Sequence, residues 1–231
     1  SRKPPLIPFN PVRDYELLKP DDEIIEPPTE AEIERIIKNA SPMLKRAIVM
    51  SYFLGLRPGT VELLSLTWAH VRWSAGVISV RSALKGGPIR RDVPIQKGFF
   101  PILQSWRKND RRDHPGCDDL PIVHYRGKRV TTLKNSWKKA LASAKIRRRL
   151  RPYDLRHYFV TRCLEEGADL KALSEVVGSR PETIWRSYQH VSRGLRQRVV
   201  ESVNPGKLAD LTSNTSSKPA KKKGAKRRPT S

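Results

Sequence analysis

The sequence contains few of the groups on which several common kinds of protein chemistry depend. Its 231 residues include two cysteines, Cys117 and Cys163, which form neither a disulfide framework nor the spacing of a zinc site. There is no Gly-x-x-x-x-Gly-Lys-Ser/Thr loop for nucleotide phosphates, and no evident carboxylate cluster for a two-metal nuclease. The sequence is therefore consistent with chemistry that uses neither a metal ion nor a cofactor.

Long apolar segments are also missing. No run of residues approaches the roughly 20 apolar residues of a membrane-spanning helix. No signal peptide opens the chain. We expect a soluble, cytoplasmic protein that has no membrane partner.

Negative charge is scarce compared with positive charge. Lysine and arginine number 46 against 23 aspartate and glutamate residues, so the net charge is +23. Residues 205–231 hold eight basic residues and one acidic residue, or +7, which leaves +16 on the first 204 residues. Such an excess concentrates polyanions and releases counterions when it binds them. The composition favours a nucleic acid as the partner and association with the nucleoid, with a merely basic, soluble surface as the alternative.

Composition divides the chain into a leader, a body and a tail. Residues 1–28 contain seven prolines and little helical period, so we expect an extended linker or arm. Residues 29–204 carry the apolar periodicity of a folded domain. Residues 205–231 are rich in Ser, Thr, Lys and Gly, and we expect this basic tail to be disordered.

The body combines several helical segments with one strand pair. Thr29 and Glu32 form a capping box that predicts the start of the first helix, and Gly55 should end the second, over residues 43–54. Beyond these we expect strands at 77–81 and 89–95, joined by Gly86-Gly87-Pro88, and helices at about 61–66, 132–144, 152–167, 170–177, 181–188 and 192–203. The pattern predicts an α+β fold that is mainly α, with a small antiparallel sheet.

Two arginines and a tyrosine suggest chemistry at a phosphate. Arg57 should lie in a turn, because Pro58 disfavours helical geometry at the residue before it. Arg156 lies in the expected helix 152–167. Guanidinium forks can hold the oxygens of one phosphate while negative charge builds up, and the hydroxyl of Tyr188 could be the nucleophile.

Four motifs in this order resemble the catalytic domain of the tyrosine recombinases, the phage integrase family. They are Gly55-Leu56-Arg57, the basic hairpin with Lys85, Leu155-Arg156-His157 and Tyr188-x-His190. The resemblance runs from about residue 29 to residue 203. It implies the fold of that domain and site-specific DNA recombination, by integration or excision, as in phages and other mobile elements.

The resemblance also implies a mechanism. Tyr188 attacks the scissile phosphate to leave a 3′-phosphotyrosine and a free 5′ hydroxyl, and a second DNA strand then attacks that link. Arg57 and Arg156 clamp the phosphate, and Lys85 protonates the departing 5′ oxygen. Since Arg81, Arg90 and Arg91 share the hairpin, each is an alternative phosphate contact.

Some positions depart from the family pattern. Tyr153 stands three residues before Arg156, where the family usually has histidine, and Ser179 stands where histidine or tryptophan is usual. Both can still donate a hydrogen bond to phosphate, so we include them among the catalytic candidates. The acidic residue expected three positions after the first arginine is replaced by Thr60, and Glu62 follows two positions later.

The partners implied by the resemblance are double-stranded DNA and further copies of this chain, forming a tetramer on DNA. Asn10-Pro11 and the following prolines resemble the linker to a smaller N-terminal DNA-binding domain, so we expect the chain to be a fragment of a longer protein. The segment 192–203 is expected to dock on a neighbouring subunit.

Two alternative functions remain open from the sequence. One is a DNA-binding or regulatory module that kept the fold while catalysis weakened, and the other is a type IB topoisomerase-like relaxation enzyme. Three structural interpretations accompany them: His157 bonds a backbone carbonyl, Trp185 lies in the core, and the basic run 145–151 grips phosphate.

Overall fold

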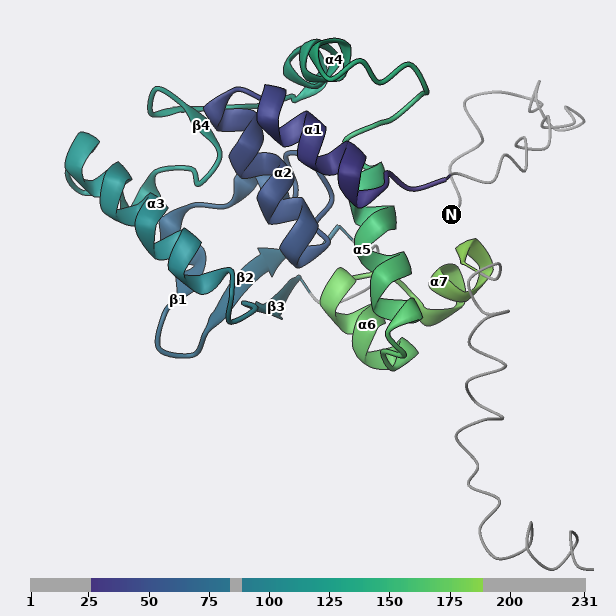
Figure 1. Cartoon of the computed structure of the whole chain (residues 1–231). Coiled ribbons are helices and arrows are strands. Elements are labelled where there is room, and N and C mark those ends of the chain that lie inside the picture. The colour runs from purple at the N-terminus through teal and green to yellow at the C-terminus, as the bar shows by residue number, and fades with distance from the viewer. Residues whose placement is uncertain (1–25, 84–88, 189–231) are drawn as a thin grey trace, which may run out of the picture.

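The computed structural model describes residues 26–83 and 89–188 (Figure 1). Its α-helices are α1 (Glu30–Asn39), α2 (Pro42–Leu54), α3 (Phe100–Asp113), α4 (Lys134–Ser143), α5 (Asp154–Glu165), α6 (Leu170–Val177) and α7 (Pro181–Ser187). Its strands are β1 (Val71–Arg72), β2 (Val77–Arg81), β3 (Arg90–Pro94), β4 (His124–Tyr125) and β5 (Lys128–Arg129). The fold is mainly helical with small antiparallel sheets, so the predicted fold class is confirmed.

The predicted capping box starts α1. The backbone nitrogen of Glu32 donates to Thr29 Oγ1 at 3.2 Å, and that of Thr29 donates to Glu32 Oε2 at 2.8 Å. The Glu32 carboxylate also accepts from Arg148 Nη2 at 2.6 Å, and this contact with Arg148 holds the pKa of Glu32 at about 2. Arg148 therefore joins the basic run 145–151 to α1 rather than facing a phosphate, whereas Arg147 and Arg149 are exposed.

Strands β1, β2 and β3 form an antiparallel sheet in that order. Ile78 pairs with Val93 and Val80 pairs with Arg91, and all four side chains are buried. The predicted strand pair is confirmed. Residues 84–88, including Lys85, lie outside the described part of the chain.

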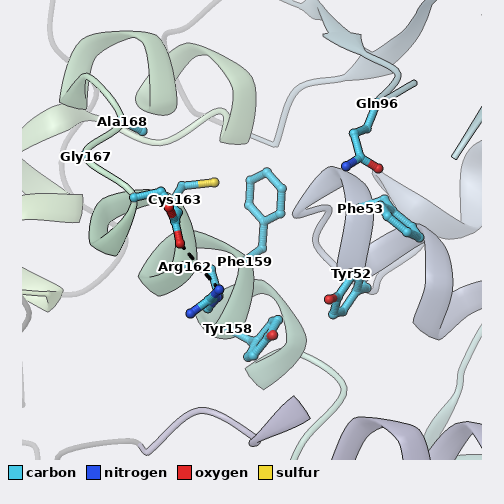
Figure 2. A pocket seen from close by; sticks show the side chains of 10 residues that line it. Tyr52, Phe53, Gln96, Tyr158, Phe159, Arg162, Cys163, Gly167 and Ala168 are labelled. Carbon is cyan, nitrogen blue, oxygen red and sulfur yellow. Dashed lines mark hydrogen bonds and ion pairs between the residues drawn. The ribbon is translucent and has the colours of Figure 1, made fainter. Parts of the chain in front are cut away.

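Aromatic side chains pack α2 against α5. Tyr52 stacks on Tyr158 with ring centroids 5.4 Å apart, and both line a cleft of about 620 Å³ that also contains Phe159 (Figure 2). Gly55 ends α2 with a φ of +60°, and a Cβ at this position would lie 2.4 Å from Phe159 Cδ1. Glycine is required here by both the backbone conformation and the close approach of α5.

Helices α6 and α7 pack on α5 around Val160, Leu173, Val177 and Ile184, and α6 also lies beside β3 (Figure 1). The α6–α7 turn is thereby fixed against both α5 and the sheet.

Two sequence predictions need correction, and one helix was not predicted. Residues 61–66 form only a short 3₁₀ turn at Leu63–Ser65, because the Glu62 side chain is drawn inward. Trp185 is 53% exposed rather than in the core. Helix α3 had no predicted counterpart; its buried Asp110 accepts hydrogen bonds from Arg46 and from Trp68 Nε1 at 2.9 Å.

The proposed arm 1–28 falls mostly outside the described residues, and the segment 192–203 and the tail 205–231 fall entirely outside them. None of the helices in the described ranges combines the length and the apolar character that crossing a membrane requires.

Candidate active site

Arg57 and Arg156 converge on the hydroxyl of Ser179. Arg57 Nη2 donates to Ser179 Oγ at 3.1 Å and to the carbonyl of Gly178 at 2.8 Å. Arg156 Nη2 donates to the same Oγ at 2.8 Å, while its Nη1 donates to the carbonyl of Gly55 at 2.8 Å. Three residues predicted as catalytic candidates, from the turn after α2, from α5 and from the α6–α7 turn, are thus brought together.

In this arrangement the Ser179 hydroxyl can still donate its proton to a bound group. A hydroxyl oxygen offers two lone pairs and one O–H group. Since both arginines donate to the oxygen, the remaining capacity of Ser179 is to donate its own proton.

Glu62 orients Arg57. The Glu62 side chain is fully buried, and its Oε2 accepts from the backbone nitrogen of Arg57 at 3.0 Å while Oε1 accepts from the Arg57 guanidinium. Glu62 is therefore the acidic residue that holds Arg57 in place.

Arg91 is a second partner of Glu62. Arg91 Nη2 donates to Glu62 Oε2 at 2.9 Å, and Arg91 Nε donates to the carbonyl of Val176 at 2.8 Å. Burial alone would raise the pKa of Glu62, but Arg91 and Arg57 outweigh it and hold the pKa below the usual glutamate value. Arg91 is buried and its guanidinium holds Glu62 and the carbonyl of Val176, and its role as an alternative phosphate contact stays a prediction.

Gly178 makes room for Arg91. Its φ is +63°, and a Cβ there would lie 2.7 Å from Arg91 Nη1. The hairpin strand β3, the turn after α2 and the α6–α7 turn therefore meet in one buried ionic cluster.

Removing the charge of Glu62 should destabilise the domain. We expect Glu62→Gln to lower the free energy of unfolding by about 3 kcal/mol at pH 7, because two guanidinium groups are left without their buried counter-charge. The lowered pKa of Glu62 means that its stabilisation is present above the ordinary glutamate pKa of about 4.3 and is lost as the pH falls through the lower folded-state value. In Glu62→Gln, the free energy of unfolding should therefore lack the part of its pH dependence that Glu62 contributes.

Urea unfolding measured from pH 3 to pH 7 tests this prediction. Glu34, exposed on α1, provides the matched control, and Glu34→Gln should unfold like the wild type. Equal stability of Glu62→Gln and Glu34→Gln at pH 7 would contradict the structural role of Glu62.

The cluster keeps an excess of positive charge. Arg57, Arg91 and Arg156 supply three guanidinium groups and Glu62 supplies one carboxylate, which leaves two positive charges. Burial, and then the charge of Arg57, lower the pKa of Arg156, yet a guanidinium remains protonated at neutral pH. The site is therefore suited to an anion such as a phosphodiester.

Two tyrosines and a histidine stand beside this cluster. Tyr153, at the start of α5, is 36% exposed, and its ring lies edge-on to that of His157 with centroids 5.2 Å apart. Tyr188 ends α7, and its hydroxyl lies 2.5 Å from Nδ1 of His157. Burial raises the pKa of Tyr188, and the positive charge of Arg156 partly opposes this.

The contact with Tyr188 corrects the sequence interpretation of His157 as a partner of a backbone carbonyl. His157 follows Arg156 directly and lies one helical turn after Tyr153, so its place at this end of α5 could be read from the sequence. Its partner on α7, 31 residues later, could not.

Five of the six predicted candidates thus lie at this end of α5 and the neighbouring turns, whereas Lys85 lies outside the described residues. Within residues 26–83 and 89–188, no group of three or more His, Cys, Asp or Glu side chains is placed to hold a metal ion.

Comparison with known proteins gives consistent matches. The family model described as "Phage integrase family" matches residues 28–194. The tyrosine recombinase XerD of Halalkalibacterium halodurans is 29% identical over 166 residues, which cover 70% of this chain and 54% of that protein. The chain thus spans about half the length of this relative.

Solved structures share the fold. The catalytic domain of bacteriophage HP1 integrase matches with a TM-score of 0.53 and 22% identity, covering 82% of this chain and 98% of that one. The integrase of transposon Tn1549, in complex with transposon right-end DNA, matches with a TM-score of 0.62 and 22% identity, covering 84% of this chain and 72% of that one.

Proposed function

The chain belongs to the phage integrase family, and from this premise we propose that it cuts and rejoins DNA at specific sites through a covalent 3′-phosphotyrosine link. The observation that carries the proposal is the convergence of Arg57 and Arg156 on Ser179. The Tyr188 hydroxyl lies beside this cluster, in contact with His157, the residue after Arg156 on α5. Relatives named as tyrosine recombinases favour recombination over simple relaxation or passive binding.

The arginines and Ser179 account for binding of the scissile phosphate. Entry of a phosphodiester would displace the Ser179 hydroxyl and put a non-bridging oxygen in the place where it now accepts from both guanidinium groups. The arginines would exchange a neutral acceptor for a charged one, and the displaced hydroxyl would donate its proton to the phosphate. Charge-assisted hydrogen bonds are roughly twice as strong as neutral ones. Because Glu62 already fixes Arg57 and the carbonyl of Gly55 fixes Arg156, little reorganisation is needed as the charge develops.

Cleavage and rejoining conserve the energy of the phosphodiester bond. Attack by Tyr188 exchanges one phosphate ester for another, so rejoining needs no external energy source. We assign protonation of the departing 5′ oxygen to Lys85. Tyr153 is assigned a hydrogen bond to the phosphate, which its exposed position at the start of α5 supports.

The partner we propose is double-stranded DNA, with the chain acting as a tetramer on two DNA sites. The +23 charge supports DNA binding, as does the match to an integrase solved with transposon-end DNA. The segment 192–203 is proposed to dock on the neighbouring subunit. Activity would be located in the cytoplasm, at the nucleoid.

The domain arrangement is part of the same proposal. Residues 1–28 would link the catalytic domain, 29–204, to a smaller N-terminal DNA-binding domain of the full-length protein. The 54% coverage of XerD is compatible with such a further domain. The basic tail 205–231 would add contacts to DNA that do not depend on sequence.

Strand exchange between two duplexes tests the proposed function. The site can be obtained first by capturing covalently bound DNA from a nicked duplex library of random sequence. Two duplexes carrying that site should then yield recombinant products. Relaxation of supercoiled DNA without any preferred sequence, and without recombinants, would instead support a topoisomerase-like enzyme.

A histidine at position 153 should be tolerated. We expect Tyr153→His to cleave within about threefold of the wild-type rate or faster, because an imidazole can donate to phosphate as the phenol does. Tyr125, 59% exposed on the β4–β5 hairpin, provides the control substitution Tyr125→His. A collapse of cleavage with an unchanged thermal unfolding midpoint would show that the phenol itself is required.

A further inference from the structure

We propose that His157 is the base that removes the phenolic proton of Tyr188 during attack on the phosphate. The inference rests on the proposed function and assigns one step within it. Its basis is the distance of 2.5 Å between Nδ1 of His157 and the hydroxyl oxygen of Tyr188, across the contact between α5 and α7.

A phenol in this position needs a base. The ordinary tyrosine pKa of about 10 leaves the hydroxyl protonated at neutral pH, and burial raises the pKa of Tyr188 further. The attacking oxygen must lose its proton as it bonds to phosphorus, or positive charge would build up on it. A positioned base within hydrogen-bond reach typically contributes about 100-fold to 10,000-fold in rate.

His157 is suited to accept that proton. Burial lowers the pKa of its imidazole from the ordinary value of 6.5, so the ring is neutral at pH 7. The groups that act on it are mixed in sign: Asp154 raises the pKa, whereas Arg151 and Arg156 lower it. Among the described residues, Tyr153 and Tyr188 are titratable groups whose rings contact the imidazole.

Tyr153 shares its face of α5 with His157. Positions 153 and 157 are one helical turn apart, so their side chains lie on the same face of the helix, and the two rings are in contact. The imidazole of His157 lies 2.5 Å from the Tyr188 hydroxyl, so it is the group placed to take the proton.

Every proton that is transferred during cleavage is returned during rejoining. In cleavage, the Tyr188 proton moves to Nδ1 of His157, the bond from the tyrosine oxygen to phosphorus forms, the bond from phosphorus to the 5′ oxygen breaks, and Lys85 protonates that oxygen. In rejoining, the 5′ hydroxyl returns its proton to Lys85 and attacks phosphorus. The departing Tyr188 oxygen then recovers its proton from His157. No co-reactant is consumed.

The first test is the tautomer of His157 in the free chain, measured by nitrogen-15 NMR. A base must present an unprotonated Nδ1, so we expect the neutral ring to carry its proton on Nε2. In Tyr188→Phe, which removes the donor, the Nδ1 resonance should shift. A proton on Nδ1 in the wild type would make His157 the donor and would overturn the proposal.

The second test is the rate of covalent attachment to a nicked suicide duplex carrying the captured site, followed from pH 5 to pH 9. His157→Asn is the informative variant, because the asparagine oxygen can occupy the place of Nδ1 and position Tyr188 but cannot take its proton. We expect it to react about 100-fold more slowly at pH 7. His114→Asn, a substitution at the end of α3, serves as the control.

The pH profiles separate a base from a positioning residue. The wild-type rate should rise with pH through the lowered pKa of His157, below 6.5, and then level off. His157→Asn should lose this plateau and keep rising. Wild-type rate and profile in a folded His157→Asn would overturn the base assignment while leaving the proposed function intact. Absence of any adduct with the wild-type chain would instead remove the proposed function itself.

Discussion

Replacing Tyr188 with phenylalanine should abolish covalent attachment of the chain to DNA. The substitution deletes one oxygen and keeps the ring that packs at the end of α7, so the fold and the DNA affinity should change little. The adduct band on a denaturing gel should fall below detection, while the dissociation constant from a binding titration stays within about threefold, well under the tenfold change that 1.4 kcal/mol would produce.

Tyr158 supplies the matched control for this experiment. It lies on α5 near the site but stacks on Tyr52, and burial together with Tyr52 raises the pKa of Tyr158 to about 12. Tyr158→Phe should therefore retain adduct formation. Undiminished adduct in Tyr188→Phe, with loss in Tyr158→Phe, would move the nucleophile from α7 to α5.

Alanine at position 57 or 156 should slow cleavage by about a hundredfold or more. Loss of one preorganised donor to a developing oxyanion has this scale, and here each arginine also orders Ser179. Single-turnover cleavage at saturating DNA separates this loss from weaker binding. Lysine should not rescue either position, because it lacks the planar fork that reaches two acceptors.

Arg162→Ala is the appropriate control for the two arginine variants. Its side chain is on α5 as well, but it is 52% exposed and pairs with Glu165 and Glu166. We expect it to cleave at nearly the wild-type rate. Losses below threefold in both Arg57→Ala and Arg156→Ala would show that these arginines are not part of the phosphate site.

Local signals made several elements predictable. The capping box at Thr29 and Glu32, the left-handed glycine at Gly55 and the helix over residues 170–177 depend on residues close in sequence, and the structure contains each of them. The motif arginines were also identifiable, since the resemblance specifies their residue types and order.

Features that depend on distant partners were not predictable. The alternation of side chains along β3 predicts which face of the strand Arg91 is on. It does not predict that the Arg91 guanidinium donates hydrogen bonds to Glu62 and to the carbonyl of Val176, because these residues are distant in sequence. A run of basic residues likewise predicts exposure to solvent or contact with phosphate. The sequence does not show that one of them, Arg148, pairs with the distant carboxylate of Glu32. The exposure of Trp185 contradicts the prediction made from its residue type, because large aromatic side chains are usually buried in a core.

The most direct measurement of the central claim is the identity of the residue that becomes linked to DNA. After reaction with the nicked suicide duplex and nuclease digestion, trypsin should release the peptide 187–193, which follows Arg186 and contains Tyr188. Mass spectrometry should find a nucleotide on Tyr188, attached through its 3′ phosphate. A 5′ linkage, attachment to another residue, or no adduct from a folded chain that binds the duplex would contradict the account.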